Sequence, residues 1–303
     1  MQDIKDCVQT VDKDYIIRLR RELHMRPEVG FDLPNTIALV KRELDSMNIT
    51  YTEKYGRSSV VAEINGDYKG FTIGIRADMD ALPITETNDI PYKSMIPGKM
   101  HACGHDAHTA MLLGTAKVLK SVEKKLDCRI KLLFQPCEEG EDSGAKYMVE
   151  DGVMDDIDII IGLHVENWLE SGHIGVCPGV SMAASRPVTI EFFGKTAHAT
   201  LPQSGHDALA MAVKAYNDIQ IMLAREIDPF ARYVCSVGSL HAGTAHNIIA
   251  DHAVMQISIR TYDTSLDKFI FNKICKLSHQ AADFFGGTAK IESDLKAYPI
   301  VND

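Results

Sequence analysis

Residues able to bind a transition metal are concentrated in three short stretches of the sequence. The stretches MHACGHDAH, QPCEEG and IGLHV contain a thiol, imidazoles and two adjacent carboxylates, supplied by Cys103, His105, Glu138, Glu139 and His164. Thiolate and imidazole ligands favour Zn²⁺, Co²⁺, Ni²⁺ or Mn²⁺ over Mg²⁺. The residue types therefore predict a transition-metal site rather than a magnesium site.

The paired glutamates indicate hydrolytic chemistry at this site. Two adjacent carboxylates are costly in an apolar crevice unless a cation offsets their repulsion. We expect one glutamate to bind metal and the other to act as general base toward a water that the metal activates. Two ions about 3.5–4 Å apart would need five or more ligands and a bridging group, which Cys103 or the water could provide.

Each of these residues has a simpler interpretation when it is considered alone. Cys103 could be a small buried hydrophobic residue, His164 a strand-end histidine, and the glutamates a solvated loop pair. Asp80 could cap the turn before Pro83. Their joint placement at one edge of a predicted sheet is what favours the metal site.

The segments around the site predict an α/β domain with a mostly parallel sheet, spanning residues 1–182. Near-continuous apolar strands that alternate with helices are typical of a parallel sheet covered on both faces. The predicted strands are 58–65, 70–76, 129–136 and 157–165, and the predicted helices are 12–25, 105–122 and 144–152.

The residues that could do chemistry directly follow these predicted strands. Asp78 and Asp80 follow the second strand, the glutamate pair follows the third, and His164 ends the fourth. Open α/β sheets bind ligands at the carboxyl ends of their strands. Since MHACGHDAH opens a predicted helix, we expect Cys103 and His105 to project into the same crevice.

Residues 183–297 show a different order of elements. The order is β-α-β-β-α-β, which predicts a ferredoxin-like α+β domain. Residues 298–303 are then expected to begin the return of the chain to the first sheet. The predicted strands are 186–195, 231–243, 250–263 and 288–297, and the predicted helices are 206–227 and 265–285.

The composition excludes several classes of protein. The chain has 303 residues, with 32 Lys and Arg against 42 Asp and Glu, and a net charge of −10. Such an acidic composition disfavours the large basic surface typical of nucleic-acid-binding proteins, and a local basic pocket stays open as an alternative. The sequence has seven cysteines without a CxxC pair, no signal-peptide pattern and no apolar stretch long enough to cross a bilayer. These features predict a cytoplasmic protein with reduced thiols and with neither nucleic-acid nor membrane partners.

Seven motifs in a fixed order resemble a known enzyme family. They are RRELHMRPEVGF, GIRADMDALPI, MHACGHDAHTAMLLG, FQPCEEG, IGLHV, GKTAHA and GTAHNIIAD. From about residue 14 to its end, the chain resembles the metal-dependent amidohydrolases related to hippurate hydrolase, N-acyl-L-amino-acid aminoacylase and plant auxin-conjugate hydrolases. The resemblance implies a catalytic α/β domain with an inserted ferredoxin-like lid, and a homodimer formed through the lid.

The resemblance also implies roles for individual residues. Glu138 matches the general base, and Asp80 matches a carboxylate that orients a histidine or the attacking water. The implied cofactors are two divalent metal ions, with Mn²⁺ or Zn²⁺ expected and Co²⁺ or Ni²⁺ as alternatives. The matching ligands are Cys103, His105, Glu139 and His164.

In the lid, the family has a histidine and an asparagine that stabilise the oxyanion and hold the substrate, often from the partner subunit. His198 and Asn247 match these two residues. A donor aimed at developing negative charge contributes about 3–4 kcal/mol to catalysis. Arg260, on a predicted strand, could bind an amino-acid carboxylate through two hydrogen bonds or could be an outward-facing cation.

We therefore predict a hydrolase that cleaves the amide bond of small N-acyl or N-aroyl amino acids, releasing a carboxylic acid and an amino acid. The alternatives are a deacetylase of the N-acetyl-diaminopimelate type, a dipeptidase or carboxypeptidase, and a non-catalytic fragment. The last alternative stays open because the family's final ligand, a histidine beyond the lid, has no match in this chain. A chain without it is expected to bind its second metal weakly and to expose apolar sheet surface.

Overall fold

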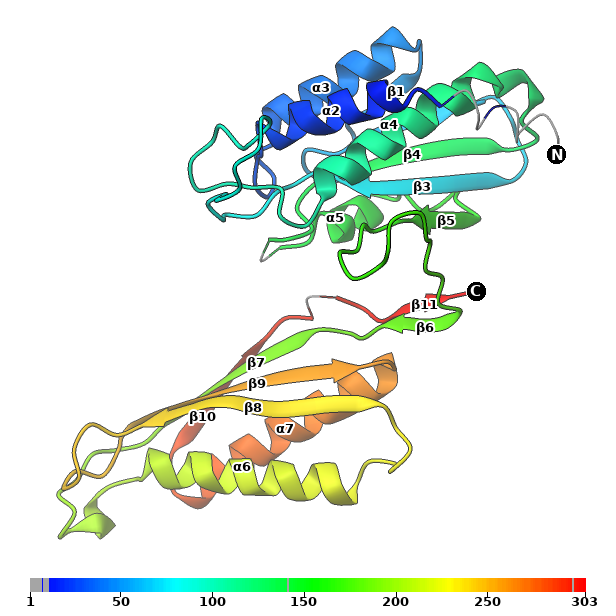
Figure 1. Ribbon diagram of the computed structural model, residues 1–303. Coiled ribbons are helices and arrows are strands. Elements are labelled where there is room, and N and C mark those ends of the chain that lie inside the picture. Colours follow the sequence, from blue (N-terminus) through cyan, green and yellow to red (C-terminus); the bar gives the residue numbers. More distant parts are fainter. Residues whose placement is uncertain (1–6, 8–10, 141, 296) are drawn as a thin grey trace. The chain divides into compact units, whose positions relative to one another are not determined.

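The computed structural model describes residues 7, 11–140, 142–295 and 297–303 (Figure 1). The chain divides into two compact units, one up to Gly172 and the other from His173 onward. Most of the first ten residues, where the sequence shows no signal-peptide pattern, lie outside the described residues, as does Lys296 of the predicted strand 288–297. In the part that is described, no helix is long and apolar enough to cross a membrane.

A five-stranded sheet is the framework of the N-terminal unit. Its strands are β1 (Thr50–Thr52), β2 (Val60–Ile64), β3 (Thr72–Asp78), β4 (Arg129–Gln135) and β5 (Ile159–Gly162). They are arranged in the order β1-β2-β4-β3-β5. β3 is parallel to both of its neighbours, whereas β2 is antiparallel to both of its own. Four of the five strands therefore run in one direction, and the mostly parallel sheet is confirmed.

Helices cover the two faces of this sheet unequally (Figure 1). Three long helices pack on one face, where Leu19, Val40 and Leu113 join alternate residues of β2 and β4 in the main core. A short helix packs on the other face, where Met148 lies in a small cluster with Leu133. The helices are α2 (Lys13–His24), α3 (Pro34–Ser46), α4 (His105–Ser121) and α5 (Gly144–Glu150), with a 3-10 turn η1 (Glu123–Lys125) after α4.

The N-terminal unit differs from the sequence prediction in two elements and one strand direction. β1 and α3 were not predicted, and the strand predicted at 58–65 is antiparallel to its neighbour. α3 begins at Pro34, where the fixed φ of proline suits the first helical position, but its N-cap makes no side-chain hydrogen bond. By contrast, α2 has a side-chain cap, because Asp12 accepts a 3.0 Å hydrogen bond from the backbone N–H of Tyr15.

β5 forms an edge of the sheet and exposes apolar side chains. Ile159, Ile160 and Ile161 are 47%, 48% and 46% exposed. Apolar side chains of the sheet are therefore exposed at this edge. His164 and Val165 lie just beyond β5, so the candidate ligand His164 directly follows an edge strand of the sheet.

The C-terminal unit has the predicted β-α-β-β-α-β order. Its four-stranded sheet has the antiparallel order β10-β7-β9-β8, with both helices on one face (Figure 1). Phe192, Met211, Met255 and Ile274 are fully buried between the sheet and the helices. These elements are β7 (Arg186–Phe193), α6 (Ala208–Arg225), β8 (Tyr233–Ala242), β9 (His252–Thr261), α7 (Thr264–Phe284) and β10 (Thr288–Ser293), with a 3-10 turn η2 (Pro202–Ser204) before α6.

A separate two-stranded ribbon belongs to the same unit. β6 (Gly179–Met182) pairs antiparallel with β11 (Ile300–Asn302). The side chain of Asn302 also donates a 2.8 Å hydrogen bond to the backbone carbonyl of Cys177. In the structure the last residues of the chain therefore pair within the C-terminal unit, at the point where the sequence predicted a return to the first sheet.

Candidate metal centre

A tight turn before α4 separates Cys103 from His105. Gly104 at this turn has a φ of 87°, in the left-handed region that favours glycine. A Cβ at this position would lie 2.3 Å from Cγ2 of Val165, so the residue must also be small. The glycine lets the thiol precede the helix and the imidazole open it, both next to the segment after β5.

His105 presents one ring nitrogen to the carboxylates at the end of β4. Its Nδ1 lies 3.3 Å from Oδ1 of Asp80, which leaves Nε2 available. Nε2 is buried and has no hydrogen-bond partner among the described residues. It lies 3.6 Å from Oδ2 of Asp78, 3.8 Å from Oε1 of Glu139 and 4.0 Å from Oε2 of Glu138. Burial lowers the pKa of His105, but the hydrogen bond to Asp80 and the nearby carboxylates raise it overall. A cation placed among these atoms would supply the missing partner of Nε2.

Cys103 and His164 form a second set of donors that shares His105. The Sγ of Cys103 lies 3.3 Å from Nε2 of His164. The Nδ1–H of His164 donates to the backbone carbonyl of Val165 at 2.7 Å, so Nε2 is the nitrogen that can bind metal. One donor atom from each of Cys103, His105 and His164 lies within 4.8 Å of the others, and the same holds for His105, Glu138 and Glu139. The predicted proximity of these residues is thus confirmed.

Asp80 holds the turn that carries the two glutamates. Its Oδ1 accepts a 3.0 Å hydrogen bond from the backbone N–H of Glu138, and its Oδ2 accepts one of 3.1 Å from that of Glu139. Cys137, just before the pair, has a φ of 48°, which is unusual for a residue with a side chain. Asp80 therefore fixes both a histidine and the glutamate turn, which explains why this carboxylate is completely buried.

The donors are surrounded by negative charge. Burial raises the pKa of the Cys103 thiol to about 12, with further contributions from Glu139 and Glu138. Burial and the charge of Glu139 raise the pKa of Glu138. A divalent cation would offset this repulsion and favour the thiolate, because a coordinating thiol loses its proton. Thiol, imidazole and carboxylate donors that repel one another without a cation fit a divalent transition-metal ion.

Two further residues at this edge, Asp78 and His108, have no role in the site predicted from the sequence. Asp78, His105 and His108 form a third group with donor atoms within 4.8 Å, but both ring nitrogens of His108 already have protein partners. Burial raises the pKa of Asp78, but the hydrogen bond from His108 and the charge of Arg76 bring it down to about 2. The signal for His108 is its spacing of three residues from His105, which places both on one face of α4.

The C-terminal unit brings His198 and Asn247 close to each other. His198 is bridged to Ile248, and the backbone carbonyl of Asn247 accepts a 3.0 Å hydrogen bond from the N–H of Ala199. Nδ1 of His198 accepts a 3.3 Å hydrogen bond from the backbone N–H of Thr200. Nδ1 also lies 2.8 Å from the hydroxyl of Thr200. When Nδ1 accepts from both groups of Thr200, the ring proton is on Nε2, and that nitrogen is then a hydrogen-bond donor.

Arg260 lies at the other end of the same sheet. From His252, where β9 begins, to Arg260 the strand advances about 26 Å at roughly 3.3 Å per residue. The guanidinium donates a 2.6 Å hydrogen bond to the hydroxyl of Ser185. The structure therefore does not group Arg260 with the histidine and asparagine, and its contacts favour the outward-facing interpretation.

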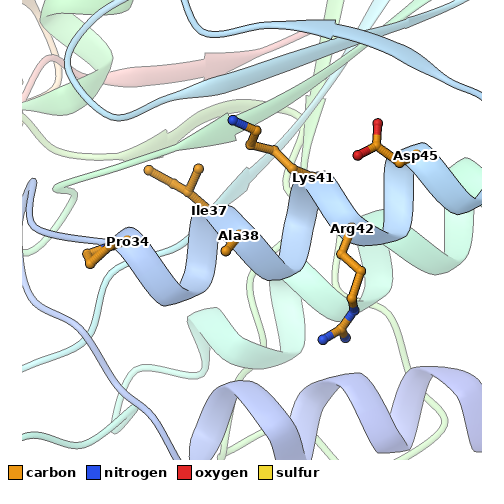
Figure 2. A pocket seen from close by; sticks show the side chains of 6 residues that line it. All are labelled: Pro34, Ile37, Ala38, Lys41, Arg42 and Asp45. Atoms are coloured by element: carbon orange, nitrogen blue, oxygen red, sulfur yellow. The ribbon is translucent and has the colours of Figure 1, made fainter.

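A shallow hollow lies away from these donors, along α3 (Figure 2). Lys41 is paired with Glu53 at 2.7 Å and Arg42 with Glu22 at 2.9 Å, so the charges at this surface are compensated. The hollow combines no thiol, imidazole and carboxylate, and it offers no chemistry of its own. Its lining consists of Pro34, Ile37, Ala38, Lys41, Arg42 and Asp45.

Comparison with known proteins gives consistent matches. Residues 74–268 match the peptidase family M20/M25/M40. The chain is 37% identical to an N-acyl-L-amino acid amidohydrolase of Geobacillus stearothermophilus over 301 residues, which are 99% of this chain and 81% of that protein. It is 36% identical to thermostable carboxypeptidase 2 of Saccharolobus solfataricus over 302 residues, covering 99% of this chain and 77% of that protein. A dinuclear metal binding peptidase of the M20 family from Bacillus subtilis has a similar structure, with a TM-score of 0.79, 31% identity, and coverage of 96% of this chain and 77% of that one.

Proposed function

The chain belongs to the peptidase family M20/M25/M40, and from this premise we propose that it hydrolyses the amide bond of small N-acyl amino acids. The products would be a carboxylic acid and an amino acid. The observation that carries the proposal is the position of His105, whose buried Nε2 lies beside Glu138 and Glu139 and within reach of Cys103 and His164. This arrangement combines metal donors with a second carboxylate that is available for proton transfer.

Two divalent ions, Mn²⁺ or Zn²⁺, are the proposed cofactors. Bound ions would polarise the amide carbonyl and make water acidic enough to attack at neutral pH. The mixture of one thiol with imidazole and carboxylate donors supports a transition metal. The proposed ligands are Cys103, His105, Glu139 and His164. They are one fewer than the five that two ions need, so we expect the second ion to bind more weakly than the first.

Glu138 is the proposed general base. Its side chain is 45% exposed, against 20% for Glu139, so it is the more accessible of the two carboxylates. Burial and the neighbouring Glu139 raise its pKa, which brings its basicity closer to the value suited to proton transfer near neutral pH. It would take a proton from the attacking water and deliver it to the nitrogen of the leaving amine. Asp80 would support this transfer by holding the glutamate turn.

In the C-terminal unit, His198 and Asn247 are the proposed donors to the substrate. In the tautomer whose Nδ1 accepts from Thr200, the Nε2–H of His198 suits an oxygen that gains negative charge during the reaction. Arg260 is not part of this proposal, because it is bonded to Ser185 at the opposite end of the sheet. We further propose a homodimer formed through the C-terminal unit, and a cytoplasmic location in which the Cys103 thiol stays reduced.

A second candidate function is that of a carboxypeptidase. The similarity to thermostable carboxypeptidase 2 supports it, since peptides and N-acyl amino acids present the same amide next to a terminal carboxylate. A panel of N-acetyl and N-benzoyl amino acids, N-acetyl-diaminopimelate, dipeptides and longer peptides separates these activities. Faster turnover of the peptides would favour the second candidate.

The test of the base uses the two adjacent glutamates as a matched pair. Glu138→Gln should lower kcat by about 10²–10⁴ while metal content stays at the wild-type value, because only proton transfer is lost. Glu139→Gln should instead lower metal content. A Glu138→Gln variant that keeps the wild-type kcat would show that another group acts as the base.

A further inference from the structure

His108 joins α4 to the segment that follows β5. Its imidazole is buried, with 3% of the residue exposed. Nε2 accepts a 2.9 Å hydrogen bond from the backbone N–H of Val165. Because that N–H can only donate, Nε2 carries no proton, and the proton on Nδ1 is donated to Oδ1 of Asp78 at 2.6 Å. The ring is therefore fixed at both nitrogens and in one tautomer.

The carboxylate that orients His108 is itself anchored. Oδ2 of Asp78 is paired with Nη1 of Arg76 at 2.7 Å, and both residues belong to β3. The hydroxyl of Thr109 donates a 2.8 Å hydrogen bond to the backbone carbonyl of Asp78. The direction of the His108 ring is thus set by the end of a central strand.

His164, in contrast, has little packing of its own. Its side chain is 44% exposed. Its Nδ1–H is bonded to the backbone carbonyl of Val165, whose N–H is held by His108. The rings of His108 and His164 meet edge to face, with centroids 4.7 Å apart. The orientation of His164 therefore depends on Val165, and the position of Val165 is set by His108.

We propose that His108 is a positioning residue that holds His164 beside Cys103 through the N–H of Val165. The close approach of Gly104 to Val165 provides the second contact that keeps this segment against α4. Partners behind a metal ligand usually change metal affinity or activity by about 10–100-fold when they are removed. The inference rests on the proposed role of His164 as a ligand, but the hydrogen bond itself does not depend on metal.

Two substitutions separate the two hydrogen bonds of the ring. His108→Asn places its amide near the former Nδ1, so it can still bond Asp78 but cannot reach Val165. His108→Gln places its amide near the former Nε2, so it can still accept from Val165. Thr109→Val is the control, because it removes a neighbouring buried hydrogen bond to the backbone of Asp78 and leaves Val165 untouched.

The first measurement is hydrogen exchange at the Val165 amide in metal-free protein. We expect faster exchange in His108→Asn and near wild-type exchange in His108→Gln and Thr109→Val. The wild-type protein alone also tests the hydrogen bond, since its Val165 amide should exchange at least about tenfold more slowly than in an unstructured peptide. An unprotected wild-type amide would overturn the inference, even if His108→Asn failed to fold.

The second measurement is metal affinity, by competition with a chromophoric chelator. His108→Asn should bind metal about 10–100-fold more weakly than wild type, with His108→Gln closer to wild type and Thr109→Val unchanged. Equal affinities for wild type and a folded His108→Asn would overturn the inference. If the wild-type protein bound no metal while the exchange pattern held, the proposed function would fail and the hydrogen bond to Val165 would stand.

Discussion

Several candidate site residues of the N-terminal unit are buried, whereas those of the C-terminal unit are exposed. At the strand edge of the N-terminal unit, Asp80, His105 and His108 are at most 3% exposed and each has a hydrogen-bond partner from another element. In the C-terminal unit, His198 and Arg260 are exposed and bond only residues nearby in the sequence or hydroxyl groups at the surface. The first arrangement resembles a site whose geometry is fixed before a ligand arrives.

This difference has a physical basis. A buried polar group is costly unless its partners are in place, so burial of these groups requires a fixed network. An exposed donor is satisfied by water and can adopt its working orientation when a substrate binds. Changes in the buried network of Asp80, His105 and His108 should therefore alter metal binding, and changes at the exposed donors of the C-terminal unit should alter turnover at constant metal content.

Metal removal should have the largest effect and should be confined to the first region. At a free-metal concentration of a thousand times Kd, binding adds about 4 kcal/mol to the stability of the unit that binds. Chelation should therefore speed hydrogen exchange in the segments 136–140 and 163–166. β9 of the C-terminal unit serves as the internal control and should exchange at an unchanged rate. Equal acceleration of hydrogen exchange in both units would contradict the expectation that metal binds to the N-terminal unit alone.

His198→Ala should have the next largest effect and should act on turnover alone. Loss of a donor to the developing oxyanion lowers kcat by about 10²–10³. His252→Ala is the matched control, because His252 is an exposed histidine of the same unit paired with Glu191 at 3.0 Å. Steady-state kinetics together with metal analysis check this prediction. A loss of metal in His198→Ala would place this histidine among the metal-binding groups instead.

Asp80→Asn should have a smaller effect, directed at metal binding. An amide has one acceptor oxygen, so it cannot hold His105 and both N–H groups of the glutamate turn. We expect about 10–100-fold weaker metal binding, measured by chelator competition. Glu28→Gln is the control, since Glu28 is a buried carboxylate that accepts from the backbone N–H groups of Asn35 and Thr36. Equal losses of affinity in both variants would show that the effect is one of general stability.

Arg260→Ala should have the smallest effect. An exposed cation bonded to Ser185 is expected to change the free energy of unfolding by less than about 1 kcal/mol, with kcat/KM nearly unchanged. A substantial rise in KM at constant kcat would instead show that the guanidinium binds the carboxylate of the substrate. Kinetics with an N-acyl amino acid and with the matching N-acyl amine, which has no carboxylate, distinguish the two results.

The sequence predicts more of the C-terminal unit than of the N-terminal sheet. The β-α-β-β-α-β order follows from regular alternation along β7 and β9 and from two long amphipathic helices. In contrast, the three-residue β1 is too short for a periodic signal, and α3 has no side-chain cap. The antiparallel direction of β2 could not be predicted, because a buried apolar strand has the same pattern in either direction.

Part of the candidate site can likewise be predicted from the sequence, and part cannot. Cys103 and His105 lie at the start of a predicted helix and His164 at the end of a predicted strand, which is enough to predict that they come together. The role of Asp80 as an acceptor for two backbone N–H groups, and the link from His108 to Val165, depend on contacts between segments far apart in the chain. No local sequence pattern predicts these contacts, so only the structure identifies these hydrogen-bond partners.

The most direct test of the metal centre is the binding of Co²⁺ followed by the absorption that a thiolate gives when it coordinates cobalt. Wild-type protein should develop this charge-transfer band on titration, and Cys103→Ser should not. Cys137→Ser should keep the band, because the Cys137 thiol donates to the backbone carbonyl of Asp142 at 3.1 Å and is not among the proposed ligands. A band that persists in Cys103→Ser, or that never forms in the wild-type protein, would contradict a metal centre built on Cys103.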